Sequence, residues 1–82
     1  MNSEFTYVIL QQRVLLTKKK YNSWREIQDE YYDEFMTSMG PFNVDEFLEY
    51  LTDDFKEEEN WPFSKEKIMS FVSSNSEVIN GR

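Results

Sequence analysis

The side chains best suited to chemistry in this chain are carboxylates that recur at helical spacing. Five of them lie between residues 26 and 34: Glu26, Asp29, Glu30, Asp33 and Glu34. Carboxylates on facing helices can hold iron or manganese, but such sites also use histidine ligands, and the chain has no histidine. A calcium-binding loop needs a glycine among its acids, and no glycine lies between these five. We therefore expect no metal site and no cofactor.

Other kinds of catalytic site are disfavoured by the composition. The chain contains no cysteine and no histidine, which excludes disulfides, thiolate nucleophiles and Ser-His-Asp triads. A carboxylate pair that hydrolyses sugars would need a substrate cleft, which an 82-residue chain is too small to provide. The longest apolar run, Tyr7 to Leu10, is far too short to span a membrane, and no signal peptide is visible. We expect a cytoplasmic protein without enzymatic activity or membrane contact.

Negative charge is concentrated in the middle of the chain. Residues 26–59 carry thirteen acidic residues against one lysine, a net charge of −12, whereas the whole chain carries −7. Helical carboxylates three or four residues apart lie about 5–6 Å from each other, a spacing comparable to that of neighbouring phosphates. This surface is either a solvated helix face or an imitation of nucleic acid. The candidate contact residues are Glu26, Asp29, Glu30, Asp33, Glu49 and Asp53.

The basic side chains gather near the beginning of the chain. They are Arg13, Lys18, Lys19 and Lys20. The lysine run suits the C-terminus of a helix, where the macrodipole favours cations, and the alternative is a contact for a phosphate or an acidic partner. Three lysines are too short a patch to specify nucleic acid, so we expect no direct nucleic-acid binding.

Two large aromatic residues flank a proline at Trp61-Pro62-Phe63. Pro62 disfavours helical geometry at Trp61, so this segment is expected to turn. Trp61 and Phe63 are expected to fill the end of the core. The alternative is that they form an exposed anchor for a partner, a role in which aromatic residues are enriched.

The pattern of residues 23–55 predicts two helices joined as an αα-hairpin. Ser23 and Glu26 fit a capping box, and apolar residues recur every three or four positions from Trp24 to Met39. Gly40 fits a C-terminal cap, and Pro41 cannot continue the helix. Asn43 and Glu46 fit a second capping box, before an apolar stripe that runs from Val44 to Phe55.

The flanking segments complete an all-α prediction. Residues 4–17 alternate like a strand but also fit a helix face, and we assign a helix because no second strand is evident to pair with it. Ser64 is expected to begin a helix at about 65–74, and residues 75–82 form a partly frayed tail. Val78 and Ile79 add a last turn or fray with it. The prediction is a single domain over residues 1–82, a compact bundle of four or five short helices with an ordered core at about 4–74.

Four stretches of this pattern resemble the small bacterial YozE family, which has a sterile-alpha-motif-like fold. Phe5 to Arg13 is similar to the family's aromatic-rich opening run, and Tyr31 to Phe35 to the end of its second helix. Pro41-Phe42 lies near the family's Phe-Pro turn, in reversed order, and Asp45 to Leu51 resembles the helix that follows. The resemblance spans about residues 5–72. It implies a bundle of four or five helices, and it brings no catalytic residues because the family has no established activity.

These observations favour a small acidic, non-catalytic module that binds another protein, of bacterial or phage type. The alternative function is a phage-encoded nucleic-acid mimic that occupies the basic groove of a DNA- or RNA-handling host protein. Seven phenylalanines and five tyrosines are also more than one small core readily hides. A surplus aromatic patch would favour a homodimer.

Overall fold

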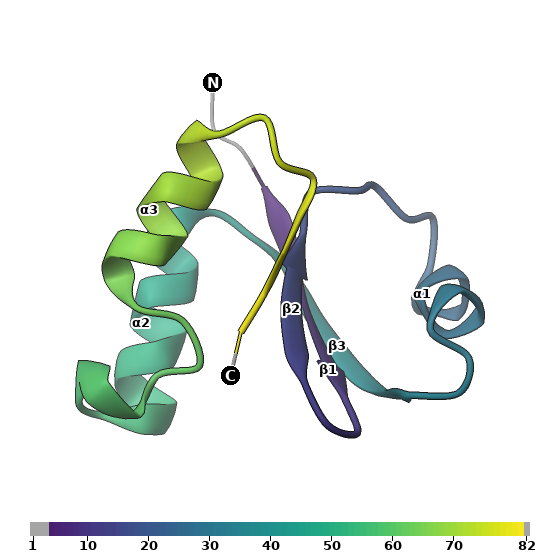
Figure 1. Cartoon of the computed structure of the whole chain (residues 1–82), viewed down its shortest axis with the longest axis horizontal. Helices are drawn as coiled ribbons and strands as arrows, with labels where there is room; N and C mark the ends of the chain where they lie inside the picture. Colours follow the sequence, from purple (N-terminus) through teal and green to yellow (C-terminus); the bar gives the residue numbers. More distant parts are fainter. Residues whose placement is uncertain (1–3, 82) are drawn as a thin grey trace.

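A four-stranded antiparallel sheet with helices on both of its faces makes up the fold (Figure 1). The structure is a computed structural model that describes residues 4–81. Along the sheet the strands follow the order β3-β1-β2-β4. In chain order the elements are β1 (Phe5–Leu10), β2 (Val14–Thr17), α1 (Trp24–Glu30), β3 (Phe35–Phe42), α2 (Val44–Phe55), the short 3₁₀ helix η1 (Glu58–Asn60), α3 (Lys65–Ser73) and β4 (Val78–Asn80).

The first segment is a β-hairpin, and the predicted helix over residues 4–17 is wrong. β1 pairs with β2 in a register that joins Tyr7 to Leu16 and Ile9 to Val14. A tight turn connects the two strands, in which the Leu10 amide donates to the Arg13 carbonyl over 2.9 Å. Gln11 and Gln12 occupy this turn without glycine, proline or asparagine, so the usual turn signal is missing. The second strand, β2, therefore lies within the stretch for which the sequence predicts a single helix.

The predicted helix over residues 23–39 is correct only in its first two turns. α1 ends at Glu30, and the chain turns and continues as β3, which pairs with β1. Gly40 is not a helix cap but a strand residue with a φ of 122°, a conformation that favours glycine. A Cβ atom at this position would lie 3.2 Å from the carbonyl oxygen of Phe5. The close approach of β1 and β3 therefore requires the absence of a side chain here.

The end of the chain is part of the sheet rather than a frayed tail. β4 pairs with β2 through Ile79 opposite Leu16, and the Gly81 amide donates to the Val14 carbonyl over 2.8 Å. Arg82, the last residue of the predicted tail, lies outside the described residues. β4 and β2, neither of which the sequence predicts, are thus neighbours in the sheet.

The two faces of the sheet carry two separate apolar clusters. The face that we call the aromatic face contains Phe5, Tyr7 and Leu16, and it is covered by α2 and α3. The opposite face, which we call the α1 face, contains Val8, Leu10 and Leu15, and it is covered by Ile27 of α1. Figure 1 shows α2 and α3 on one side of the strands and α1 on the other. The alternation of side chains along β1 divides the core in this way.

The two longer helices begin where the sequence predicts. Asn43 and Glu46 form the predicted capping box at α2, with distances of 2.9 and 3.0 Å. Ser64 accepts from the Lys67 amide at the start of α3. The capping box predicted at Ser23 is wrong, because the Ser23 side chain makes no capping hydrogen bond. Glu26 instead accepts from the amide of Asn22, one residue earlier.

The fold is therefore a mixed α/β sheet structure and not the all-α bundle predicted from the sequence. The central αα-hairpin is wrong, because β3 separates α1 from α2 and the two helices lie on opposite faces of the sheet. The sterile-alpha-motif-like bundle implied by the family resemblance is contradicted for the same reason. No helix within residues 4–81 is long and apolar enough to cross a membrane.

Candidate functional site

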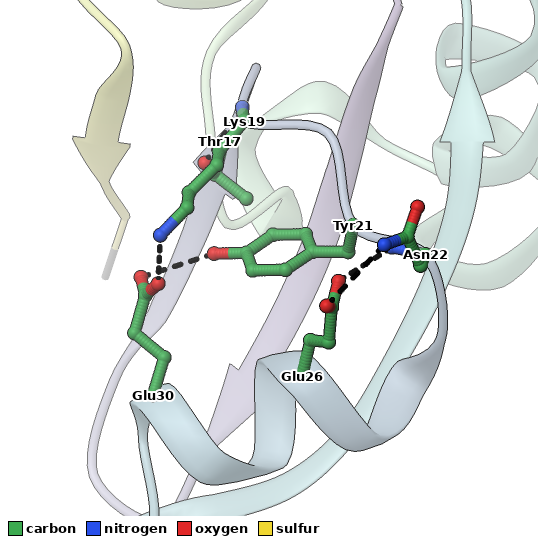
Figure 2. A network of polar contacts seen from close by, with 6 residues as sticks. All are labelled: Thr17, Lys19, Tyr21, Asn22, Glu26 and Glu30. Atoms are coloured by element: carbon green, nitrogen blue, oxygen red, sulfur yellow. Dashed lines mark hydrogen bonds and ion pairs between the residues drawn. The ribbon is translucent and has the colours of Figure 1, made fainter.

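Glu30, at the end of α1, is occupied by contacts within the protein (Figure 2). Its carboxylate accepts from the ammonium of Lys19 and, over 3.0 Å, from the hydroxyl of Tyr21. The hydrogen bond from Lys19 lowers the pKa of the Glu30 carboxyl. Burial of the Tyr21 phenol and its hydrogen bond to Glu30 raise the pKa of Tyr21. Both partners belong to the segment that leads from β2 into α1. Glu30 therefore links the end of α1 to the connection between β2 and α1.

Two further acids of the predicted ladder are also used internally. Glu26 accepts from the backbone amide of Asn22 over 2.6 Å, a contact drawn in Figure 2. Glu34 receives two hydrogen bonds from the guanidinium of Arg13, at 3.2 and 3.1 Å. Arg13 also donates to Asn80 of β4. Arg13 therefore links the β1–β2 turn both to the residue that precedes β3 and to β4. We assign Glu26, Glu34 and Arg13 to the structure of the fold.

Asp29 and Asp33 are the exposed remainder of the ladder. Within residues 4–81 neither side chain takes part in an ion pair, since the pairs found there join Arg13 to Glu34 and Lys19 to Glu30. Asp29 lies on α1, but Asp33 lies in the turn that follows, because the helix ends at Glu30. The five acids therefore do not form the continuous helical face that their spacing predicts.

A continuous row of carboxylates is found on α2 instead. Asp45, Glu49 and Asp53 follow one another at intervals of four residues along its twelve residues, and all three are exposed. In the part of the chain that the structure describes, none of them makes an ion pair. We call these three residues the acidic stripe. Glu49 and Asp53 were predicted as contact residues, whereas Asp45 was missed, although its distance of four from Glu49 was a usable signal.

The other acids of α2 are engaged locally. Glu46 completes the capping box with Asn43. Burial of the Tyr50 phenol, together with the neighbouring carboxylate of Asp54, raises the pKa of Tyr50. Among the acids of α2 in the described residues, only those of the acidic stripe lack such a contact, and like charges four residues apart destabilise a helix by about 0.2–0.5 kcal/mol per pair. Asp45 lies in the first turn of α2, where the macrodipole favours an acid, whereas Glu49 and Asp53 lie further along the helix.

The three lysines do not act together. Lys18 donates to the carbonyl of Ser74, the C-cap residue of α3, and its ammonium lies 4.6 Å from the centre of the Phe71 ring. Lys19, which is exposed, pairs with Glu30 on the opposite side of the sheet, and Lys20 is exposed without an ion pair in the described residues. Lys18 alone therefore lies at a helix C-terminus, where the macrodipole favours a cation, and that helix is α3, distant in sequence.

A hollow of about 610 Å³ lies beside α1, where this short helix leaves one end of the sheet uncovered. It is lined by residues of the β2–α1 connection, including Lys20, Tyr21 and Trp24, and by Ser38 and Pro41 of β3. Trp24 is 56% exposed. The lining mixes one acid, three lysines and aromatic rings, and the ammonium groups of Lys18 and Lys19 are engaged elsewhere. This hollow does not define a ligand class.

Trp61 and Phe63 belong to the core. They are 7% and 1% exposed, and Phe63 packs against the rings of Tyr7 and Phe47. A partner cannot reach either ring in this conformation, so neither residue is part of the candidate surface.

The predicted contact residues are thus divided between two faces. Glu49 and Asp53 lie on the outside of the aromatic face, whereas Glu26, Asp29, Glu30 and Asp33 lie on the α1 side. Among residues 4–81, no group of three or more Asp and Glu side chains is arranged to hold a metal ion. Comparisons of the chain with protein families, with curated proteins and with solved structures find no match. The acidic stripe is the candidate site that the geometry itself defines.

Proposed function

We propose that this protein is a non-catalytic binding module that attaches to a basic surface of another protein through the acidic stripe of α2. The observation that carries the proposal is the unequal use of carboxylates. On the α1 side, Glu26, Glu30 and Glu34 are bound by groups of the protein itself. On α2, the three carboxylates of the stripe remain available to a partner.

The shape of the surface suits such a partner. α2 is a regular helix, and its buried side is held against the sheet by Phe47 and Leu51, both 0% exposed. The stripe is therefore presented on a rigid support, which limits the entropy lost on binding. Electrostatic attraction between complementary surfaces chiefly provides specificity and rapid association. The expected partner is a cytoplasmic protein with Lys or Arg side chains in a row.

Two matched double variants test the proposal. Glu49→Lys with Asp53→Lys reverses two charges of the stripe, and Asp29→Lys with Asp33→Lys reverses two exposed charges on the α1 side. Both pairs are four residues apart and change the net charge equally. After a partner is captured from the native host, its affinity is measured for the purified wild type and for both variants.

The stripe variant is expected to bind at least about tenfold more weakly, a loss of roughly 1.4 kcal/mol, while the α1-side variant binds like the wild type. Wild-type binding should weaken as salt is raised, because salt screens exposed charges. Equal losses of affinity in the two variants would mean that binding depends only on net charge. A loss of affinity confined to the Asp29 and Asp33 variant would place the binding site on the α1 side. Either result contradicts the proposal.

The acidic stripe also supports a narrower function, a protein that imitates nucleic acid. Its carboxylates form a single file with a spacing of about 5–6 Å, and phosphates along a nucleic-acid strand are spaced comparably. Under this alternative, the captured partner handles DNA or RNA, and a short duplex displaces the protein from it. Failure of duplex and single-stranded competitors to displace it would reject the mimic but leave the binding module intact. The protein itself is expected to give no gel shift with nucleic acid at low salt.

A further inference from the structure

β3 forms one edge of the sheet, and its outer side is open. The strand has eight residues, whereas β4 at the opposite edge has three. Within residues 4–81 no strand pairs with the outer side of β3. An open edge presents backbone N–H and C=O groups with which an extended chain can pair.

The register shows which backbone groups of β3 point outward. In β1 the Leu10 amide donates toward the β2 side of the hairpin. Backbone groups of successive residues point to opposite sides of a strand, so those of Ile9 face β3. Ile9 lies opposite Thr37, and the pairing continues without irregularity to Ser38. The backbone groups of Thr37 therefore face β1, and those of Ser38 point to the open side.

β3 has no charge of its own but is bounded by carboxylates. No charged residue occurs from Phe35 to Val44. Asp33 precedes the strand and Asp45 follows it; both are exposed, and neither makes an ion pair within residues 4–81. A segment complementary to this edge is uncharged in its middle and carries Lys or Arg at its ends. The net charge of −7 attracts such a segment to the protein.

The hollow beside α1 reaches this edge strand. Ser38, Gly40 and Pro41 of β3 contribute to its lining, as does the exposed ring of Trp24. By itself the hollow defines no ligand class, but a segment paired with β3 directs alternate side chains to this face of the sheet. An apolar side chain of that segment enters the hollow. Its burial adds contact area that strand pairing alone lacks.

Exposed apolar side chains lie at the other end of the same edge. Tyr32, in the turn before β3, is 80% exposed, and Met36 of β3 is 61% exposed; these are the two highest values among the large apolar residues described. Methionine adapts its shape readily to a partner surface. A bound segment therefore meets apolar contacts along the whole strand.

We propose that the β3 edge binds an extended segment of another protein, which joins the sheet as a further strand. The segment has uncharged residues along β3, basic residues at its ends and an apolar side chain in the hollow. A second copy of this chain is disfavoured as the occupant, because two chains that each carry −7 repel each other. The proposal goes beyond the function proposed for the acidic stripe and does not rest on it, since the main-chain pairing involves β3 alone.

Two peptide libraries serve as the probe. Each has eight random residues, the length of β3, between lysines at both ends or between glutamates at both ends. Peptides enriched on the wild type are synthesised, and their affinities for variants are measured by fluorescence anisotropy. Ser38→Pro removes an outward N–H, and Ser38→Ala keeps it and removes only the hydroxyl. Asp33→Lys and Asp53→Lys make the same change of charge, beside the β3 edge and on the acidic stripe.

The lysine-flanked library is expected to yield binders and the glutamate-flanked library none. Binding should be at least about tenfold weaker in Ser38→Pro and about threefold weaker in Asp33→Lys. Ser38→Ala and Asp53→Lys should bind like the wild type. The Asp53→Lys result separates this site from the acidic stripe, because that variant affects the stripe alone.

Hydrogen exchange of the wild type decides the question if Ser38→Pro does not fold. A bound peptide should slow exchange of the Ser38 amide and leave that of Val78, on the opposite edge strand, unchanged. The proposal is overturned if neither library yields binders or if glutamate-flanked peptides bind better. It is also overturned by equal affinities of Ser38→Pro and Ser38→Ala, or by protection at Val78 instead of Ser38.

Discussion

The two faces of the sheet are held in different ways. The aromatic face buries nine side chains in one cluster, among them Phe5, Phe47 and Phe63. The α1 face buries four, and Ile27 is the one buried residue of its helix. Polar contacts supplement this smaller core, since Glu30 holds Lys19 and Tyr21 and Glu34 holds Arg13.

This difference explains where carboxylates are free. A helix with a rich apolar face is fixed by burial, so its outer side chains are not needed to hold it in place. α2 is such a helix, and its stripe is unpaired. α1 has seven residues, too few for a stable isolated helix, and two of its three carboxylates, those of Glu26 and Glu30, bind the segment that precedes it. The surface that we propose for a partner thus lies on the side of the sheet that has the larger core.

The sharpest test of the comparison is Phe47→Ala. Phe47 is 0% exposed and its ring contacts those of Phe5, Tyr7 and Phe63. Its truncation leaves a cavity in the aromatic face, so we expect a loss of about 3–5 kcal/mol in the free energy of unfolding. Small domains have little more than this in total, so the variant should be largely unfolded in chemical denaturation experiments. A loss below about 1 kcal/mol would contradict the assignment of the main core to this face.

Ile27→Ala removes the corresponding contact on the α1 face. Ile27 is 4% exposed and packs against Val8, Leu10 and Leu15. We expect a loss of about 2 kcal/mol, at the low end for such truncations, because α1 can shift to fill the space. Hydrogen exchange should show α1 opening while β1, β2 and α2 remain protected. Uniform loss of protection across the sheet would show that the two faces do not unfold separately.

The helix caps offer a smaller contrast between the faces. Asn43→Ala removes the cap of α2 and should cost about 1 kcal/mol in unfolding free energy. Ser23→Ala should change stability by less than about 0.5 kcal/mol, because the Ser23 side chain caps nothing. Thermal and urea unfolding of the two variants side by side measure the difference. Equal losses would mean that Ser23 caps α1 in solution.

The smallest expected effect concerns pH. The pKa of Glu30 is lowered in the folded protein, so its contribution to stability is present above its ordinary value of 4.5 and is lost as the pH falls through the folded value. Acid should therefore loosen α1 before it affects α2. Amide exchange of residues 24–30 measured against pH, in the wild type and in Glu30→Gln, tests this. The variant should show weaker protection at neutral pH and little further change on acidification.

The sequence alone determined the parts whose signals are local. The capping box at Asn43, the cap at Ser64 and the apolar spacing of α2 and α3 each operate within a few residues, so these helices could be predicted nearly to their ends. Glu49 and Asp53 of the candidate site followed from the same helix. The composition also disfavoured metal and thiol chemistry without any structure.

Only the tertiary structure shows which strands pair in the sheet and which charged side chains form ion pairs. Strand pairing joins residues far apart, such as Val8 with Ser38 and Leu16 with Ile79, and no local pattern shows that a partner exists. The run from Tyr31 to Met39 has helical spacing, but its second half pairs with β1 and is a strand. For the same reason, the sequence could not show that Glu30 meets Lys19, whereas Asp45, Glu49 and Asp53 make no ion pair within residues 4–81. Charges are paired by distance in space, and the packing of the sheet sets that distance.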